Sequence, residues 1–116
     1  MNKKGAVSLP ELEEQFHAVI NSVQNGIMAV DCQGILTLVN KMAEEILGIK
    51  RENLIGRSVV EVYPETLLLG ILESKKPLLG QKLIVNGTVV MANYAPIMVN
   101  GKMNGAVSVF QDISVM

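Results

Sequence analysis

The fold is decided by the stretch NGIMAVDCQGILTLVNKMAEEILG, residues 25–48. Two apolar runs, residues 27–30 and 35–39, flank a short polar segment in which Gly34 can adopt a positive φ angle. This pattern predicts a tight antiparallel hairpin. Asn40 stands where a helix N-cap is expected, and Gly48 can end that helix in the left-handed conformation. The stretch therefore predicts two paired strands that lead directly into a short capped helix.

The rest of the chain predicts further short helices and then three strands. Helical segments are expected at residues 50–56, 58–62 and 65–75. The periodicity then changes to two, and strands are expected at residues 81–85, 88–99 and 103–110. Asn86-Gly87 and Asn100-Gly101 are strong hairpin signals between these strands, and Pro96 predicts an edge or a bulge. Together the elements predict an α+β domain with a five-stranded antiparallel sheet and helices on one face.

The N-terminal residues predict a tail followed by an amphipathic flanking helix. Residues 1–7 show no periodicity and are expected to form a mobile tail, and Ser8 with Glu11 forms a capping box. The apolar stripe of this helix consists of Leu9, Leu12, Phe16, Val19 and Val23. The stripe can pack on the domain's own sheet or pair with a second copy of the helix, and Ile20 widens the apolar face enough for both. We expect these five residues to form a homodimer interface.

Composition limits the classes of function. The chain has 116 residues, 49% of them hydrophobic, and a net charge of −1, which fits one domain and argues against a nucleic-acid surface. No apolar run approaches the roughly 20 residues that span a bilayer, and no secretory signal is present. Cys32 is the single cysteine, so no internal disulfide can form and a reducing compartment is expected. A cytoplasmic location and no membrane partner are therefore expected.

The sequence offers no cluster of residues for catalysis or metal binding. His17 stands among the polar positions of the first helix, where a surface role is expected. Cys32 lies in the hairpin turn without a nearby histidine, which argues against a nucleophile. No spacing typical of a metal site and no phosphate-binding loop appears. We therefore expect a protein that is not an enzyme and holds no metal.

Two motifs resemble a known family. The pattern N-G-I-x-A-V-D-x-x-G-x-L-x-x-x-N, followed by A-x-x-x-L-G, resembles the start of a PAS sensory domain. The segment GAVSVFQDIS, residues 105–114, resembles the last PAS strand with its closing Asp-Ile-Ser/Thr signature. The resemblance covers residues 16–114. It implies a PAS domain at residues 25–114, preceded by a tail and flanking helix at residues 1–24.

The resemblance also narrows the cofactors. Haem-binding members of the family use a histidine on the last helix before the three strands, and residues 65–75 contain none. Photoreactive flavin members carry a cysteine in an Asn-Cys-Arg-type motif on a helix, whereas Cys32 lies in the hairpin. Non-covalent flavin binding usually relies on Trp, which is absent. Haem and covalently photoreactive flavin are therefore not expected. Two alternatives remain: an apolar pocket for an unidentified small molecule, or a filled core.

Strand alternation and the resemblance together predict the pocket. In PAS domains the pocket residue of the last strand often precedes the closing Asp by two positions, which is Phe110 here, and Ser108 shares its face. Tyr94 and Ser108 are the polar groups expected to converge on an apolar space. The predicted pocket-lining residues are Met28, Val30, Ala43, Ile46, Leu67, Leu68, Ile71, Val90, Ala92, Tyr94, Ser108 and Phe110. The alternative is that these residues form only a packed core.

The opposite face of the sheet is also predicted to be apolar. Val89, Met91, Val107 and Val109 alternate with the pocket residues and therefore face away from the helices. A sheet that is apolar on both faces needs a second cover. The first helix can supply one and a partner subunit another, which favours a homodimer.

These expectations combine into one functional hypothesis. The resemblance implies a cytoplasmic sensory domain of a larger bacterial-type signalling protein, such as a two-component histidine kinase, a cyclic-dinucleotide enzyme or a transcription activator. An output domain outside this chain is therefore expected. The domain is expected to bind a small apolar ligand, to form a homodimer, or to do both, so that repacking of the inner face shifts the dimer contact. The alternative is a ligand-free module for protein–protein interaction and dimerisation.

Overall fold

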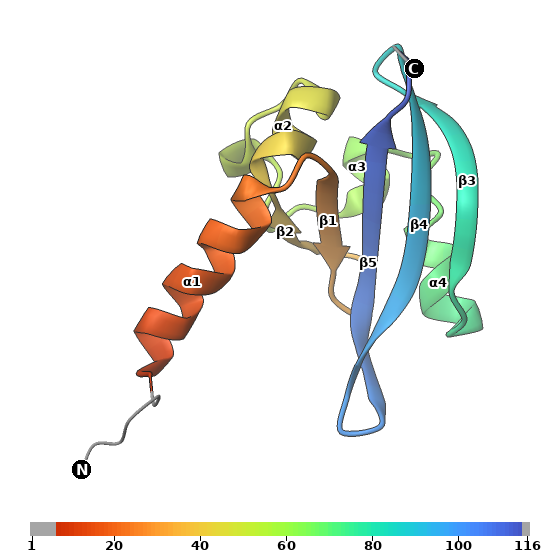
Figure 1. Ribbon diagram of the computed structural model, residues 1–116. Helices are drawn as coiled ribbons and strands as arrows, with labels where there is room; N and C mark the ends of the chain where they lie inside the picture. The colour runs from red at the N-terminus through yellow and green to blue at the C-terminus, as the bar shows by residue number, and fades with distance from the viewer. Residues whose placement is uncertain (1–6, 115–116) are drawn as a thin grey trace.

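The hairpin and capped helix predicted from residues 25–48 are present in the computed structural model, which describes residues 7–114 (Figure 1). β1 (Gly26–Val30) and β2 (Leu36–Val39) are antiparallel, and α2 (Lys41–Leu47) follows directly. The Asn40 side chain accepts a hydrogen bond from the Ala43 N–H at 3.0 Å, and Gly48 ends α2 with a φ of 75°. The capping prediction is confirmed at both ends. Apart from Val7, the tail expected at residues 1–7 lies outside the described residues.

The remaining helices are short, except for the first. They are α1 (Leu9–Ser22), the 3-10 turn η1 (Arg51–Asn53), α3 (Val59–Val62) and α4 (Leu68–Ser74). The predicted capping box starts α1, because the Ser8 N–H donates to Glu11 Oε1 and the Glu11 N–H donates to Ser8 Oγ. Ser58 precedes α3 as expected, but its side chain makes no capping hydrogen bond.

α4 begins three residues later than predicted. The segment before it forms a turn in which the Thr66 N–H donates to the Tyr63 carbonyl at 3.1 Å. The Thr66 hydroxyl then accepts from the Leu68 N–H at 3.1 Å. A threonine side chain that bonds to the backbone in this way competes with helical hydrogen bonds. Residues 65–67 are therefore turn rather than helix.

All five strands join one antiparallel sheet in the order β2-β1-β5-β4-β3, which confirms the predicted fold class. β3 (Leu78–Val85), β4 (Thr88–Val99) and β5 (Lys102–Asp112) are joined by the two predicted hairpin turns. Asn86 and Asn100 both have a φ of 51°, and the glycines after them also have positive φ, as type I′ turns require. β3 begins at Leu78 rather than at the predicted residue 81, because Leu78 also pairs with Tyr94 of β4. The register of the two strands shifts between Leu78 and Gln81.

Pro96 lies where β4 has become an edge strand. β3 pairs with β4 only as far as Tyr94, so Pro96 pairs with Ala106 of β5 and with no residue of β3. Because β3 does not pair with β4 at this position, the missing N–H of Pro96 costs no hydrogen bond between these two strands. A register shift follows between Ile97 and Met98. Beyond this point the β4–β5 hairpin extends past the rest of the sheet (Figure 1).

The core lies between the inner face of the sheet and the short helices. In Figure 1, α3 and α4 lie behind β4 and β3. Val90, Ala92 and Tyr94 of β4 are buried, whereas Met91 between them is 36% exposed on the outer face. The predicted alternation of inner and outer residues is thus confirmed for this strand. The buried core also includes Leu36 and Leu54.

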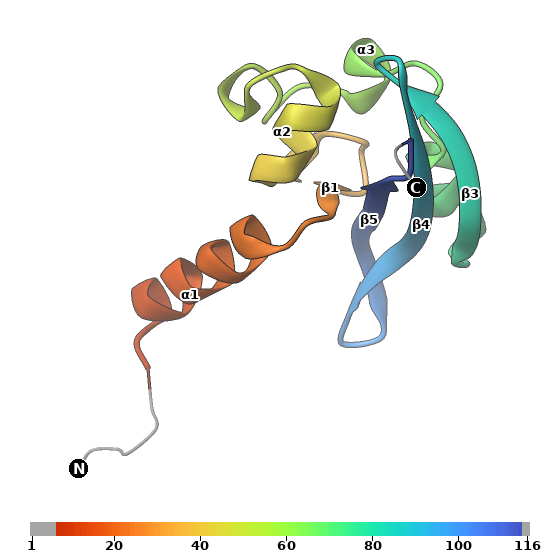
Figure 2. The ribbon, with the colours of Figure 1, turned by 45° about the horizontal axis from the view of Figure 1, so that its top comes forward.

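α1 projects away from the rest of the domain in both views (Figures 1 and 2). Within Leu9–Ser22 only Ile20 is buried. The five residues of the apolar stripe are 39–71% exposed. Of the two alternatives for the stripe, packing on the domain's own sheet is therefore not observed, because α1 is held only at its last turn. No helix within residues 7–114 is long and apolar enough to cross a membrane.

Candidate functional site

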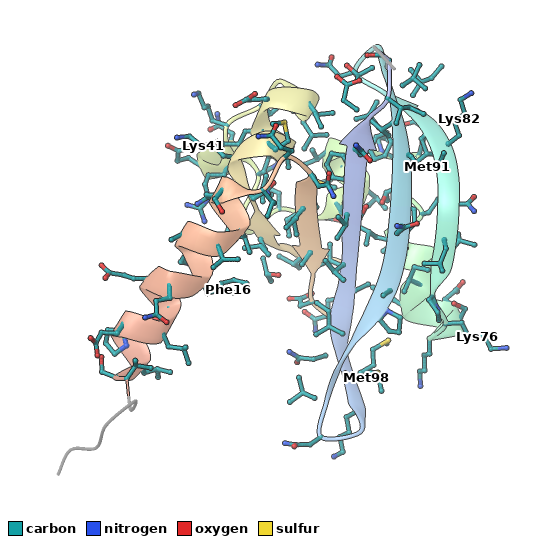
Figure 3. All side chains as sticks on the ribbon, viewed as in Figure 1. Phe16, Lys41, Lys76, Lys82, Met91 and Met98 are labelled. Carbon is teal, nitrogen blue, oxygen red and sulfur yellow. The ribbon has the colours of Figure 1, made fainter. Side chains whose placement is uncertain are left out.

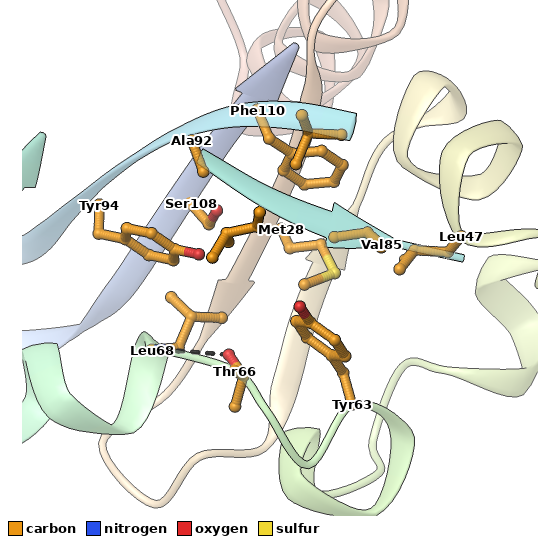
Figure 4. A pocket seen from close by; sticks show the side chains of 12 residues that line it. Met28, Leu47, Tyr63, Thr66, Leu68, Val85, Ala92, Tyr94, Ser108 and Phe110 are labelled. Carbon is orange, nitrogen blue, oxygen red and sulfur yellow. Dashed lines mark hydrogen bonds between the residues drawn. The ribbon is translucent and has the colours of Figure 1, made fainter. Parts of the chain in front are cut away.

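A small cavity lies between the inner face of the sheet and the segment that joins α3 to α4 (Figure 4). Its volume is about 20 Å³. This volume is sufficient for about one water molecule. The side chains that line it are Met28, Leu47, Tyr63, Thr66, Leu68, Leu83, Val85, Val90, Ala92, Tyr94, Ser108 and Phe110. The interior is thus close to filled in this conformation.

Most of the predicted pocket residues lie at this cavity, and the rest lie in the core around it. Those that line it are Met28, Leu68, Val90, Ala92, Tyr94, Ser108 and Phe110. Those that are placed elsewhere in the core are Val30, Ala43, Ile46, Leu67 and Ile71. The structure therefore brings the strand residues together more completely than the helix residues. The reason is that strand alternation fixes which face a side chain takes, whereas short helices leave their rotation open.

Five lining residues were missed by the sequence analysis: Leu47, Tyr63, Thr66, Leu83 and Val85. Leu83 and Val85 could have been found, because they alternate with the exposed Lys82 and Ile84 along β3. Tyr63 lies in the irregular segment after α3, where no periodicity indicates a direction. Its position depends on how that segment crosses the end of the sheet.

Tyr94 is the main polar group of the cavity. It pairs across the strands with Ser108, and its side chain is only 4% exposed. Burial raises the pKa of Tyr94 to about 12, Tyr63 adds to this shift, and the hydrogen bond with Ser108 opposes it. Burial, with a smaller contribution from Glu65, also raises the pKa of Tyr63. Both phenols are therefore neutral at physiological pH. All the lining residues are uncharged, so the site favours neutral groups.

Phe110 stands at the end of the cavity because Gly26 leaves room for its ring. The two residues pair directly between β1 and β5. A Cβ atom added at Gly26 would overlap the Phe110 ring. A side chain here would push the ring toward Met28 and the cavity (Figure 4). The size of the cavity thus depends on a glycine outside it.

Asn40 connects α1 to the sheet and to α2. Its side chain is 1% exposed, and its Nδ2 group donates to the Ile20 carbonyl at 2.6 Å and to the Asn25 carbonyl at 3.0 Å. Its Oδ1 atom accepts from the Ile27 N–H at 2.8 Å and from Ala43. One amide side chain therefore joins the end of α1, the start of β1 and the first turn of α2.

A second hydrogen bond supports this junction. The Lys41 N–H donates to Asn21 Oδ1 at 2.9 Å, so α1 and α2 are also joined through their own termini. Ile20, the one buried residue of α1, lies at the same end. The direction in which α1 leaves the domain is therefore fixed at its last turn, while its first three turns contact little else.

Cys32 and His17 lie apart from the cavity. The Cys32 thiol is exposed in the β1–β2 turn and donates to the Met103 carbonyl at 3.2 Å. His17 is exposed on α1, with its ring 5.7 Å from the Phe16 ring between centroids. Within residues 7–114 no group of three or more His, Cys, Asp and Glu side chains gathers as a metal site would require.

The chain is similar to a known protein family and to parts of bacterial sensor kinases. The PAS fold family matches residues 14–113. A probable C4-dicarboxylate sensor kinase of Halalkalibacterium halodurans is 37% identical over 106 residues, which covers 91% of this chain and 20% of the relative. The sensor histidine kinase DcuS of Escherichia coli is 27% identical over 107 residues, covering 87% of this chain and 19% of that protein.

A solved structure shows the same fold. The PAS domain of a protein from Colwellia psychrerythraea superimposes with a TM-score of 0.68 at 20% identity, covering 90% of this chain and 99% of that chain. The chain spans about one fifth of the length of the curated relatives it matches. The family match at residues 14–113 spans the sheet, the short helices and the C-terminal part of α1. The chain thus belongs to the PAS fold family and is a sensory domain related to the PAS domains of bacterial sensor histidine kinases.

Proposed function

We propose that this domain forms a homodimer through the apolar stripe of α1 and relays a conformational signal to an output module outside the chain. The observation that carries the proposal is the exposure of the five stripe residues, at 39–71%. A contiguous exposed apolar surface of this kind is typical of an interaction site. A short helix also gains most of its stability from packing, and α1 packs on the domain only at Ile20.

The relay would act through the Asn40 junction. α1 is held to the sheet and α2 by the hydrogen bonds of Asn40 and Asn21. A change in how two α1 helices are held would therefore be transmitted to β1, which pairs with β5 along its whole length. β5 ends at Asp112, close to the end of the described chain. In this role the domain carries out no chemical reaction itself. The output module would be a histidine kinase, as the names of the relatives indicate.

The dimer is tested by sedimentation equilibrium of the full chain. Leu12→Asp and Phe16→Asp each place a charge in the stripe, and we expect each to raise the dimer Kd tenfold or more, because burial of such a side chain contributes roughly 1.5–3 kcal/mol. Ala18→Asp is the matched control, because Ala18 lies on the opposite side of the helix. A monomeric wild-type protein, or equal effects of all three substitutions, would refute the proposal.

A second candidate function is the binding of a small neutral molecule, favoured by the Tyr94 and Ser108 hydroxyls that face the cavity. A cavity of about 20 Å³ must enlarge to accept one, and the turn that carries Tyr63 and Thr66 is the part of its lining that lies outside the helices and strands. Native mass spectrometry of freshly purified protein tests this. A retained molecule that is lost in Ala92→Leu, which fills the cavity, would support ligand sensing. No retained molecule would favour the ligand-free interaction module.

A further inference from the structure

Four asparagines of this chain are followed directly by glycine, and asparagine loses its side-chain amide most readily at such a pair. The four are Asn25, Asn86, Asn100 and Asn104. Glycine has no side chain to shield its N–H group, so its nitrogen can reach the amide carbon of the asparagine before it. In an unfolded chain the four sites are therefore close to equivalent. In the folded domain each of them has a different environment, and only one environment permits the reaction.

Deamidation requires the backbone to rotate at the asparagine. Hydroxide from the solvent removes the N–H proton of the glycine, and the glycine nitrogen attacks Cγ of the asparagine. A succinimide ring closes through the new N–Cγ bond, the Cγ–Nδ2 bond breaks, and the amide group takes a proton from water and leaves as ammonia. Water then opens the ring at either carbonyl and gives aspartate or isoaspartate, without any oxidant or reductant. A reactive site therefore needs an exposed glycine N–H and a backbone that can move.

Asn25 and Asn104 lack this freedom, because the glycine after each of them is buried in the sheet. Gly26 lies against the Phe110 ring and pairs with this residue between β1 and β5. Gly105 lies so close to a carbonyl of β1 that an added Cβ atom would overlap it. The peptide bond before either glycine can rotate only if strands of the sheet separate. Both sites are therefore protected by the fold.

Asn86 lies in an exposed turn, but its side chain is tied to α2. Its Nδ2 group donates to the Ile46 carbonyl at 3.3 Å and lies beside Gly48, where that helix ends. The turn is closed by the pair Val85 and Thr88, and Val85 is only 7% exposed in the core. The Asn86 side chain must give up its hydrogen bond before its Cγ atom can approach the next nitrogen. This site is therefore restrained, although solvent reaches it.

Asn100 lies at the tip of the β4–β5 hairpin, and it meets both requirements. It is exposed, as is Gly101, and no residue within 7–114 forms a hydrogen bond with its side chain. The turn is closed by the pair Val99 and Lys102. In such a two-residue turn the backbone hydrogen bond joins the flanking residues, which leaves the N–H of Gly101 to solvent.

The backbone around this tip can also open at little cost. Only two pairs of residues lie between the turn and the register shift that follows Ile97. Met98, in the second of these pairs, is 53% exposed. Figure 3 shows Met98 on the part of the hairpin that extends past the rest of the sheet. A two-stranded ribbon without further cover is only marginally stable, so local opening is frequent there.

We infer that Asn100 is a site of spontaneous deamidation in the folded domain, and that the fold protects Asn25, Asn86 and Asn104. The reaction replaces a neutral amide by a carboxylate, and the isoaspartate product adds a methylene group to the backbone of the turn. The change stays at the tip, because past Pro96 neither strand of the hairpin pairs with β1 or β3. This inference does not depend on the proposed homodimer.

Incubation of the full chain at mildly alkaline pH tests the inference. Digestion with pepsin at acidic pH stops the reaction, and mass spectrometry with electron-transfer fragmentation locates each aspartate and isoaspartate. We expect Asn100 to deamidate at least about fivefold faster than Asn86, because only Asn86 has to give up a hydrogen bond. Asn25 and Asn104 should stay intact over the same period. The control is the same incubation in guanidinium chloride, where all four sites should react at similar rates.

Matched variants identify the product independently. Asn100→Gly and Asn86→Gly each remove one site and keep the turn, because Gly-Gly also fits a type I′ turn. The acidic form that accumulates on ion exchange should be absent from Asn100→Gly and present in Asn86→Gly. The inference is wrong if any of the other three sites reacts as fast as Asn100 in the folded protein. It is equally wrong if Asn100 is still intact when the denatured chain has reacted completely.

Discussion

The inner face of the sheet and the stripe of α1 carry similar residues but lie in opposite environments. Leu68, which packs against the inner face, is 0% exposed, whereas Leu12 of the stripe is 51% exposed. Both are leucines on amphipathic helices of the same chain. The difference shows that one copy of this domain buries the first apolar surface in its own core and leaves the second exposed. The predictions below test this division, from the largest effect to the smallest.

Truncation of a buried leucine should have the largest effect on stability. Leu68→Ala removes a fully buried side chain beside the cavity and should lower the free energy of unfolding by about 2–5 kcal/mol. Leu12→Ala, the matched change in the stripe, should alter it by less than about 0.5 kcal/mol when the protein is dilute. Urea unfolding of both variants measures the comparison. Equal losses would mean that α1 contributes to the folded core of a single copy.

The Asn40 junction should show the next largest effect. Asn40→Ala removes two donated and two accepted hydrogen bonds in a buried position, and a loss of about 2–3 kcal/mol is expected. Asn21→Ala removes a single exposed bond at the same junction and should cost about 1 kcal/mol or less. Hydrogen exchange should show lost protection at the start of α2 and β1 in Asn40→Ala. Protection equal to that of the wild type would show that the Asn40 hydrogen bonds do not stabilise the start of α2 and β1.

The neutral phenol of Tyr94 predicts a loss of stability at high pH. Its pKa is raised from 10.0 to about 12 in the folded state, so the unfolded chain releases this proton first as the pH rises. The stabilisation is present below pH 10 and is lost between pH 10 and 12, by up to about 2 kcal/mol. Tyr94→Phe should flatten this part of the stability profile measured in urea. If the substitution leaves the pH dependence of the free energy of unfolding unchanged, the phenol of Tyr94 contacts solvent in the folded state.

The charge of Lys82 should have the smallest effect, on association rather than on folding. Lys82→Glu places a negative charge beside Met91 on the outer face of the sheet, and we expect it to raise the Kd of the proposed dimer about two- to fivefold, the size of effect that an exposed ion pair with the acidic α1 of a second copy would have. Lys50→Glu changes the net charge equally at a site outside the strands and is the control. Sedimentation at low and high salt measures both. Equal shifts in the two variants would indicate only a general charge effect.

Local residue patterns predicted the fold well, because the signals that specify it are short in range. Asn40 and Gly48 define the limits of α2, and Asn86-Gly87 and Asn100-Gly101 define the hairpins, each through its own side chain or φ angle. The start of α4 was predicted too early, since an apolar run does not reveal that the Thr66 hydroxyl holds a turn. The strands were predicted with small errors at their ends: β3, for example, begins at Leu78 rather than at residue 81.

The candidate site was predicted less completely, because it also depends on contacts between residues that lie far apart in the sequence. Asn40 was predicted as an N-cap, but its bond to the Ile20 carbonyl, twenty positions away, depends on how α1 meets the sheet. The stripe of α1 was correctly predicted to be apolar, yet amphipathicity does not say what a face contacts. Tyr63 lines the cavity from an irregular segment, where no sequence periodicity indicates which way its side chain points. Long-range geometry of this type is supplied only by the tertiary structure.

The extension of the β4–β5 hairpin has a practical use. Past Pro96 and Ala106 neither strand pairs with β3 or β1, and Asn100 and Gly101 at the tip are both exposed. A reporter peptide or a small fluorescent domain inserted between Asn100 and Gly101 should leave the core intact, since exposed turn tips tolerate insertions. The tip thus provides a place to label the domain without altering either of its apolar surfaces.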